Sequence, residues 1–428
     1  MNIEKIHNYF LNSTGVTTDT RKIEKDNFYV ALKGANFNGN TFASKAIELS
    51  AKYVLIDEAE YQINENCILV DDCLKTLQEL AKYHRNYLKN IKIIGLTGSN
   101  GKTTTKELIY AVLSQKYNTV ATKGNLNNHI GVPLTILSFN EQTEIGIVEM
   151  GANHQKEIEF LCSIAEPDYG YITNFGKAHL EGFGGVEGVI KGKSELYQYL
   201  EKNNKIAIIN LDDAIQIEKS KTLESITFGK NNTTAYINIK EVEANPMVKV
   251  SFNQTTIQSH LIGLYNSNNI NAAITLGKVF QVTDEQIKAG IEGYIPENNR
   301  SQLLSKNGYE IILDAYNANP SSMHAALTNF FQLEQHPKTA ILADMFELGE
   351  ESTTEHNKLI QLCSTENSVE FYLIGKEFNK NKISQSNLHF FETFEEFKLH
   401  LENKSINKGL LLIKGSRGMS LERTLDFI

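Results

Sequence analysis

The segment GLTGSNGKTTTKEL, residues 95–108, constrains the fold more than any other part of this 428-residue chain. The run before it, IKIIGL, is typical of a buried strand, and TTTKELIYAVLSQKY places Leu108, Ile109, Val112 and Leu113 on one helical face. Glycines between a strand and a helix let backbone N–H groups wrap phosphate oxygens at the positive end of the helix dipole. The pattern predicts a phosphate-binding loop, and the alternative is a glycine-rich turn that binds no ligand.

The expected contacts of this loop with a nucleotide follow from its chemistry. Lys102 would reach the β- and γ-phosphates, and Thr103 could supply a hydroxyl to Mg²⁺. The spacing departs from the common phosphate-loop pattern, because Leu96 stands where that pattern begins with glycine. The residues predicted to bind the nucleotide here are Gly98, Ser99, Asn100, Gly101, Lys102, Thr103 and Thr104.

Length and composition limit the class of protein. A chain of this size predicts two or three domains. The net charge of -9 argues against nucleic-acid binding, which rewards clustered Lys and Arg, and favours a small-molecule partner. The four cysteines form no Cys-x-x-Cys pair, and no stretch reaches the roughly 18 apolar residues that a membrane helix requires. We expect a cytoplasmic protein with reduced thiols and no membrane segment.

Three series of short apolar runs define the expected domains. Residues 1–88 contain NFYVAL, AKYVLID and NCILVDD and end in a helical segment, which predicts a small α/β domain. Residues 89–297 alternate apolar runs with helical segments, which predicts a parallel sheet wrapped by helices around the phosphate loop. The runs YEIILD, KTAILADM, VEFYLIG and KGLLLIKGS predict a Rossmann-like domain over residues 298–428. The fold class is therefore α/β with three domains.

The loop TGSNGKT resembles that of the Mur ligase family, the ATP-dependent amide-forming enzymes that also include folylpolyglutamate synthetase. The resemblance extends over nearly the whole chain. It is carried further by ATKGNLNNHIGVP, VEMGANHQKEIEFL, AHLEGFGGVEGVIKGKSELY, DAYNANPSSMHAAL, ADMFELGEES and LLIKGSRGMSLE. The resemblance implies ATP and Mg²⁺, with two ions expected, and a monomer.

Two of these motifs, NLNN and HLEGFG, resemble the branch of the family that joins D-alanyl-D-alanine to UDP-N-acetylmuramoyl-tripeptide in building the peptidoglycan precursor. Because a carboxylate lacks a good leaving group, ATP would first convert it into an acyl phosphate, which the free amine then attacks. Two alternatives remain. The chain could be a Mur-type ligase that adds another amino acid or extends folate, or a phosphate-loop regulator that forms no amide.

The resemblance also implies catalytic residues and metal ligands. Glu149 closes an apolar run at the sheet edge where α/β ligand sites form, so it is a candidate Mg²⁺ ligand beside Thr103. His179 matches a family metal ligand, although imidazole is a less usual Mg²⁺ partner than oxygen. Lys193 matches a lysine that many Mur ligases carry as a carbamate. The alternatives are that Lys193 is unmodified, or that Lys191 is the matching lysine. Lys102, His179 and Lys193 are the predicted catalytic residues.

The remaining predicted contacts are spread over the three domains. Asn269 matches an adenine contact, Arg300 a phosphate contact and Asp314 a ribose contact, while Tyr265 and Asn40 stand where relatives commonly carry His. Asparagine clusters are otherwise usually turns. Because different domains hold the substrates, we expect the C-terminal domain to close on binding and exclude water. The expected contacts with the UDP-muramoyl-peptide and D-alanyl-D-alanine are Thr20, Lys33, Gly34, Asn127, Asn128, Asn317, Asn319, Lys414, Ser416 and Arg417.

Overall fold

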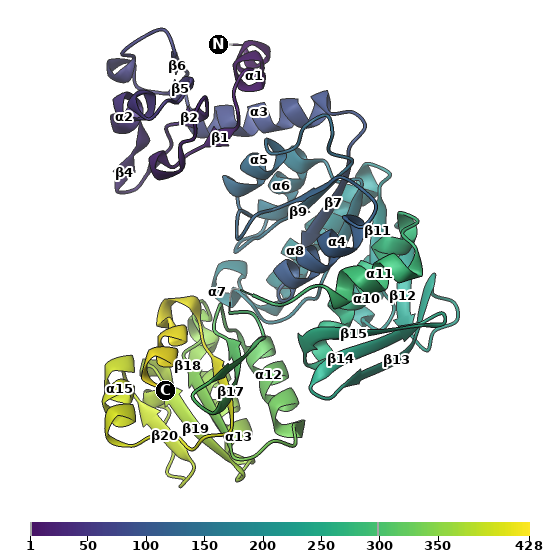
Figure 1. The fold of residues 1–428 in the computed structure, drawn as a ribbon, viewed down its shortest axis with the longest axis vertical. Coiled ribbons are helices and arrows are strands. Elements are labelled where there is room, and N and C mark those ends of the chain that lie inside the picture. Colours follow the sequence, from purple (N-terminus) through teal and green to yellow (C-terminus); the bar gives the residue numbers. More distant parts are fainter. Residues whose placement is uncertain (1, 298) are drawn as a thin grey trace.

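The computed structural model describes residues 2–297 and 299–428, and it has three α/β domains with the central domain between the other two (Figure 1). The prediction of three α/β domains is confirmed. Residue 298, where the third domain was predicted to begin, lies outside the described residues. Among the described residues, no helix is both long and apolar enough to cross a membrane.

The N-terminal domain has a four-stranded parallel sheet in the order β1-β2-β5-β6, as its short apolar runs predict. A two-stranded hairpin, β3–β4, lies outside this sheet. The strands are β1 (Val16–Thr17), β2 (Phe28–Val30), β3 (Lys33–Gly34), β4 (Phe37–Asn38), β5 (Tyr53–Ile56) and β6 (Cys67–Leu69), and the helices are α1 (Ile3–Leu11), α2 (Ala43–Glu48) and α3 (Cys73–Tyr87).

The central domain is built on a nine-stranded sheet in the order β15-β14-β13-β12-β11-β10-β7-β9-β8. Helix α4 follows β7 directly, and Leu108, Ile109, Val112 and Leu113 of α4 are buried, as their spacing predicts. The strands are β7 (Lys92–Thr97), β8 (Thr119–Ala121), β9 (Ile145–Glu149), β10 (Tyr169–Ile172), β11 (Ile206–Asn210), β12 (Ser225–Lys230), β13 (Ile237–Ala244), β14 (Met247–Phe252) and β15 (Thr255–Ile262). The helices are α4 (Lys102–Leu113), α5 (Gly131–Ile136), α6 (Glu157–Ala165), α7 (Leu180–Phe183), α8 (Val186–Lys202), α9 (Ala214–Lys219), α10 (Ser267–Val279) and α11 (Asp284–Glu292).

The far edge of this sheet differs from the expected all-parallel arrangement. Strands β13, β14 and β15 pair antiparallel, whereas β8 to β13 pair in parallel. Only two residues separate each of these strands from the next, and such short connections permit hairpins but no helical crossover. Along β14, buried and half-buried residues alternate from Met247 to Phe252, which is the pattern of a strand covered on one face.

The C-terminal domain has a six-stranded sheet in the order β16-β17-β21-β18-β19-β20, parallel except for β16. Its central strands are the predicted apolar runs, and β18 and β21 are buried along their whole length. The strands are β16 (Gln302–Lys306), β17 (Tyr309–Asp314), β18 (Lys338–Ala343), β19 (Val369–Ile374), β20 (Leu388–Phe391) and β21 (Leu410–Lys414), and the helices are α12 (Pro320–Gln332), α13 (Ser352–Ser364), α14 (Lys376–Lys380) and α15 (Phe394–Asn403).

Candidate active site

A cavity of about 1110 Å³ lies at the carboxyl edge of the central sheet and is closed on one side by the C-terminal domain. Its walls come from the loops after β7, β9, β10 and β11, the start of α10, and the loop between β17 and α12. Many of the predicted site residues line it, namely Ser99, Asn100, Gly101, Lys102, Thr103, Thr104, Asn127, Asn128, Glu149, His179, Asn269, Arg300, Asp314, Asn317, Asn319 and Lys414.

Two glycines of the phosphate loop are required by close approach and backbone conformation together. Gly98 has φ +138°, and a Cβ there would lie 2.1 Å from the Oγ1 of Thr173. Gly101 has φ +78°, and a Cβ there would lie 2.7 Å from the Oδ1 of Asn269. Residues other than glycine rarely adopt such φ values, so the loop can take this path only with glycine at both positions.

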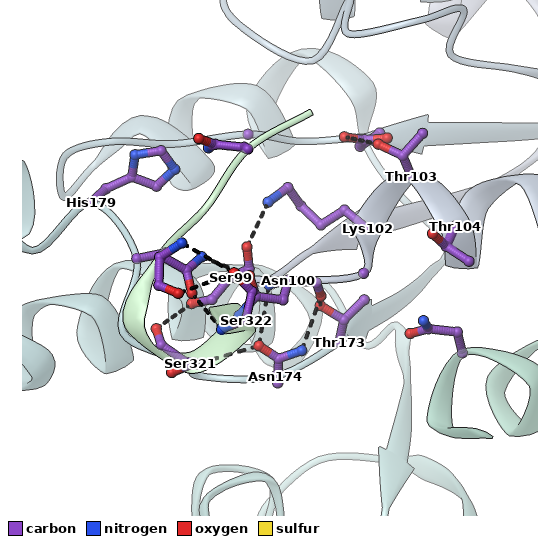
Figure 2. Close-up of a pocket in the computed structure, with 18 of the residues that line it drawn as sticks. Ser99, Asn100, Lys102, Thr103, Thr104, Thr173, Asn174, His179, Ser321 and Ser322 are labelled. Atoms are coloured by element: carbon purple, nitrogen blue, oxygen red, sulfur yellow. Dashed lines mark hydrogen bonds between the residues drawn. The ribbon is translucent and has the colours of Figure 1, made fainter. Parts of the chain in front are cut away.

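Residues at the end of β10, which the sequence analysis did not identify, hold this loop (Figure 2). Thr173 Oγ1 donates to the carbonyl oxygen of Asn100 over 2.6 Å, and Asn174 Nδ2 donates to the same oxygen over 2.9 Å. The backbone N–H of Asn100 donates to Asn174 Oδ1 over 3.2 Å, and that of Ser99 donates to the Asn174 carbonyl. The run PDYGYITNFG contained the signal, because polar residues at the carboxyl end of a parallel strand face the ligand edge.

The ammonium group of Lys102 folds back over the loop. Its Nζ donates to the carbonyl oxygen of Gly98 over 2.7 Å and lies 3.4 Å from that of Ser99. Removal from water lowers the pKa of Lys102, the nearby Glu149 carboxylate opposes this, and the Arg300 guanidinium adds to it. A phosphate group in the loop would supply the anionic partner that these carbonyl dipoles replace only in part.

Glu149 ends β9 with a buried carboxylate. Its Oε1 accepts hydrogen bonds from Thr103 Oγ1 at 3.2 Å and from Asn127 Nδ2 at 2.8 Å. Among the described residues, its Oε2 has no hydrogen-bond partner. A buried carboxylate oxygen is costly to leave unpaired, and carboxylate and hydroxyl oxygens are the ligands that Mg²⁺ prefers. The pairing of Glu149 with Thr103 therefore fits a magnesium site.

The structure brings His179 against a carboxylate of the C-terminal domain. His179 adopts φ +53° just before α7, and its Nδ1 makes a short hydrogen bond to an oxygen of Glu347. This hydrogen bond holds the pKa of Glu347 below its usual range, against the opposing effect of burial and with a smaller electrostatic contribution from the imidazole ring. A metal would have to bind His179 at Nε2, and a carboxylate on the other ring nitrogen is a usual orienting partner for such a ligand. Sequence reasoning did not identify Glu347.

Lys193 is fully buried in α8 and does not line the cavity. Its Nζ donates to the carbonyl oxygen of Ala152 over 2.9 Å and lies 4.8 Å from the centre of the Phe183 ring. Burial, followed by the charge of Lys102, lowers the pKa of Lys193 well below its usual value. The alternative assignment, Lys191, is exposed on the same helix.

Two predicted nucleotide contacts, Asn269 and Arg300, line the same cavity as the phosphate loop. The amide of Asn269 is buried, accepting from Thr105 Oγ1 at 2.9 Å and donating to Asn266 Oδ1 at 2.8 Å. The guanidinium of Arg300 stacks 3.6 Å above the ring of Tyr316. Stacking of this kind leaves the planar edge of the guanidinium able to meet phosphate oxygens.

Two residues predicted for different subsites meet in an ion pair. Lys414 Nζ lies 2.6 Å from Asp314 Oδ2, and the backbone N–H of Ser301 donates to Asp314 Oδ1 over 3.2 Å. The side chain of Lys414 is buried and also reaches the carbonyl oxygen of Asn317 over 3.3 Å. The ribose and dipeptide contacts expected from these two residues would therefore be adjacent.

Several predicted substrate contacts hold local turns. Asn128 Oδ1 accepts hydrogen bonds from the backbone N–H groups of Ile130 and Gly131, and Asn319 caps the N-terminus of α12.

Two further predicted contacts lie outside the cavity. Ser416 is buried, and its Oγ accepts a hydrogen bond from the backbone N–H of Phe346. Arg417 is exposed and bonds Glu422 over 2.8 Å.

The three residues predicted in the N-terminal domain lie away from the large cavity. Thr20 lines a smaller cavity of about 450 Å³ together with Asp19, Arg21 and aromatic side chains. Lys33 Nζ forms an ion pair with Asp57 over 3.0 Å, and Gly34 is exposed in β3. Asn40 is buried and donates to the same Asp57 carboxylate over 2.8 Å.

Three family models match successive parts of the chain. The model described as "Mur ligase family, catalytic domain" matches residues 12–85, "Mur ligase middle domain" matches 96–277, and "Mur ligase, glutamate ligase domain" matches 299–417. These three matches together cover most of the sequence, from the N-terminal sheet to the last strand of the C-terminal sheet.

Individual relatives match over almost their full length. The UDP-N-acetylmuramoyl-tripeptide–D-alanyl-D-alanine ligase of Bacillus subtilis is 36% identical, over 95% of this chain and 91% of its own. A crystal structure of MurF from Acinetobacter baumannii superposes with a TM-score of 0.87 at 27% identity, covering 99% of this chain and 97% of that one. MurF from Thermotoga maritima, solved in complex with ADP, gives a TM-score of 0.84 at 26% identity, covering 98% and 97%.

Proposed function

The chain belongs to the Mur ligase family, and on that premise we propose that it joins D-alanyl-D-alanine to UDP-N-acetylmuramoyl-tripeptide at the expense of ATP. The product is the UDP-muramoyl-pentapeptide used in peptidoglycan synthesis. The proposal draws on the named relatives and on one observation of the site: the phosphate loop and a buried carboxylate with an unpaired oxygen face the same cavity.

The reaction proceeds in two bond exchanges. First, a carboxylate oxygen of the tripeptide attacks the γ-phosphorus of ATP, which forms an acyl phosphate and releases ADP. The free amine of D-alanyl-D-alanine then attacks the acyl carbon, expels phosphate and loses a proton. Lys102 and the backbone N–H groups at the start of α4 hold the phosphates, and Arg300 approaches them from the C-terminal domain. Positioning and charge neutralisation carry most of the rate enhancement, because two anions must meet.

We assign the Mg²⁺ ligands to Thr103 and Glu149, with His179 and Lys193 at a second ion. When bound, Mg²⁺ neutralises the repulsion between the triphosphate and the attacking carboxylate. Glu149 Oε2, which has no hydrogen-bond partner in residues 2–297 and 299–428, supports the first assignment. The pairing of His179 with Glu347 supports the second, because it orients the imidazole ring.

Lys193 is proposed to carry a carbamate. Carbamate formation requires a neutral amine, and the lowered pKa of this buried lysine favours that form. The modification would replace the buried amine with oxygen ligands beside Ala152, which lines the cavity and accepts a hydrogen bond from Lys193. Incubation with ¹³C-labelled bicarbonate and observation of a carbamate ¹³C signal, absent from a Lys193→Arg variant, tests this assignment.

Substrate contacts complete the proposal. Asn127 and Asn128 would contact the muramoyl-peptide, and Thr20, Lys33 and Gly34 its UDP group. Asn317, Lys414, Ser416 and Arg417 would contact the dipeptide, with Asn269 and Asp314 at the adenosine. We propose a monomer that works in the cytoplasm, where ATP is available, with domain boundaries near 88/89 and 297/298.

Phosphate release tests the function. We expect release that requires UDP-muramoyl-tripeptide and D-alanyl-D-alanine together, with a pentapeptide product identified by mass spectrometry. Tripeptides ending in lysine and in diaminopimelate, assayed separately, show which third residue is accepted. Amide formation with another amino acid, or with folate, would assign a different Mur-type reaction, and nucleotide binding without any amide product would indicate a regulator.

A further inference from the structure

The C-terminal domain touches the phosphate loop through one amide pair. Asn319 Nδ2 donates to Asn100 Oδ1 over 2.7 Å, although the two residues lie 219 positions apart in the chain. At its other end, Asn319 Oδ1 accepts the backbone N–H of Ser322 over 2.9 Å and so caps α12. The side chain of Asn319 is thus anchored to the first turn of α12 and directed at the loop.

A second set of contacts joins the same two regions. The backbone N–H of Lys177 donates to Ser321 Oγ over 2.8 Å, and Lys177 Nζ pairs with the buried carboxylate of Glu355 over 2.8 Å. Lys177 follows Thr173 and Asn174, which hold the backbone of Asn100. Figure 2 shows Asn174, Ser321 and Ser322 close to Asn100 of the loop.

Asn100 is consequently fixed on its backbone by the central domain and on its side chain by the C-terminal domain. Its backbone N–H and carbonyl are bonded to residues 173 and 174, whereas its Oδ1 is bonded to Asn319. Movement of the C-terminal domain would break the second bond and leave the first set intact. The side-chain orientation of a loop residue therefore depends on where the other domain sits.

We propose that Asn319 is a positioning residue: it sets the side chain of Asn100 and thereby couples the position of the C-terminal domain to nucleotide binding in the phosphate loop. This inference rests on the proposed ATP-dependent ligation and replaces the expected substrate contact of Asn319. Because coupling between two equilibria is reciprocal, nucleotide in the loop also favours the docked position of the C-terminal domain.

The variant Asn319→Ser separates positioning from helix capping. Serine is as good an N-cap as asparagine but cannot reach Asn100, so the melting temperature should stay unchanged. Loss of this partly buried hydrogen bond predicts a dissociation constant for ADP, measured by calorimetry, that is raised about tenfold. The KM for ATP should rise by the same factor, and the KM for D-alanyl-D-alanine should stay unchanged.

A double-mutant cycle with Asn100→Ala completes the test. We expect Asn319→Ser to have no further effect on ADP binding once Asn100 is alanine. A raised KM for D-alanyl-D-alanine with unchanged ADP affinity would make Asn319 a substrate ligand and overturn the proposal. An equal loss of ADP affinity in both backgrounds would also overturn it. Since ADP binding needs no turnover, failure of the wild type to form the amide would count against the proposed reaction alone.

Discussion

At the scale of single residues, the site combines groups that are costly in isolation. Within the described part of the chain, one oxygen of the buried Glu149 carboxylate has no partner. Backbone carbonyls hold the ammonium of Lys102, whose pKa burial lowers. The two groups carry opposite charges. A bound magnesium–nucleotide complex would neutralise both, with Mg²⁺ at Glu149 and the phosphates at Lys102. Such a site is expected to gain stability when its ligand binds.

Lys102→Ala removes the cationic group at the phosphates. We expect kcat for phosphate release to fall on the order of 100- to 1000-fold, which is typical for the loss of one preorganised charge donor. The matched control is Lys202→Ala, because Lys202 is exposed at the end of α8 and is given no role in the reaction. A folded Lys102→Ala enzyme with undiminished amide formation would remove the basis of the functional assignment.

At the scale of elements, helix α3 fastens the N-terminal domain to the central sheet. Arg85 near the end of α3 lies 3.1 Å from Asp168, which precedes β10, and donates to the carbonyl oxygens of Ala165 and Glu166. The other oxygen of Asp168 lies 2.7 Å from Lys205. Both Arg85 and Asp168 are largely buried, so neither charge is well solvated without the other.

Asp168→Ala should leave Arg85 without its buried partner. We expect a loss of about 3 kcal/mol in the free energy of unfolding, measured by chemical denaturation, because an uncompensated buried charge is costly. Glu218→Ala is the control, since Glu218 and its partner Lys219 form an exposed pair on α9. Equal stability of the two variants would show that the Arg85 pair contributes no more than a surface contact.

A pair of buried histidines links α1 to α3. His7 Nε2 lies 3.0 Å from His84 Nδ1, and His84 Nε2 donates to the carbonyl oxygen of Phe139 over 2.9 Å. Burial, aided by His84, lowers the pKa of His7 from 6.5 to about 4, and burial also lowers the pKa of His84. Both rings are therefore neutral in the folded protein near pH 7.

This pair predicts a loss of stability in acid. Between pH 6.5 and about 4 the unfolded chain binds a proton at His7 that the folded chain does not, so the free energy of unfolding decreases as the pH falls through that window. Thermal unfolding between pH 7 and 4.5 measures the slope. His7→Phe, which keeps an aromatic ring but cannot titrate, should give a shallower slope, and an identical slope would contradict this account.

At the scale of the whole molecule, the N-terminal and C-terminal domains contact opposite parts of the central domain (Figure 1). The smaller cavity lies in the N-terminal domain, and the larger one lies between the central and C-terminal domains. The UDP-muramoyl-tripeptide is expected to span both. We expect the radius of gyration, measured by small-angle scattering, to decrease when an ATP analogue and both substrates are added. An unchanged radius would argue against domain closure.

Local patterns in the sequence determined the strands, the helices and the phosphate loop. The face of α4 and the buried runs of β7, β9, β18 and β21 follow from hydrophobic spacing, because that spacing reports burial within one element. The need for Gly98 and Gly101 is also local, because the turn that contains them joins β7 directly to α4. The antiparallel edge was missed, since its direction depends on connection length rather than on apolar content.

Only the tertiary structure decided which side chains meet. Asn100 and Asn319, His179 and Glu347, and Asp314 and Lys414 come from segments far apart in the chain, and no local pattern encodes their distances. The family resemblance predicted the site residues, whereas the packing of the domains decided their partners. The physical reason is that a hydrogen bond or ion pair forms only within a few ångströms, and domain packing sets separations on that scale.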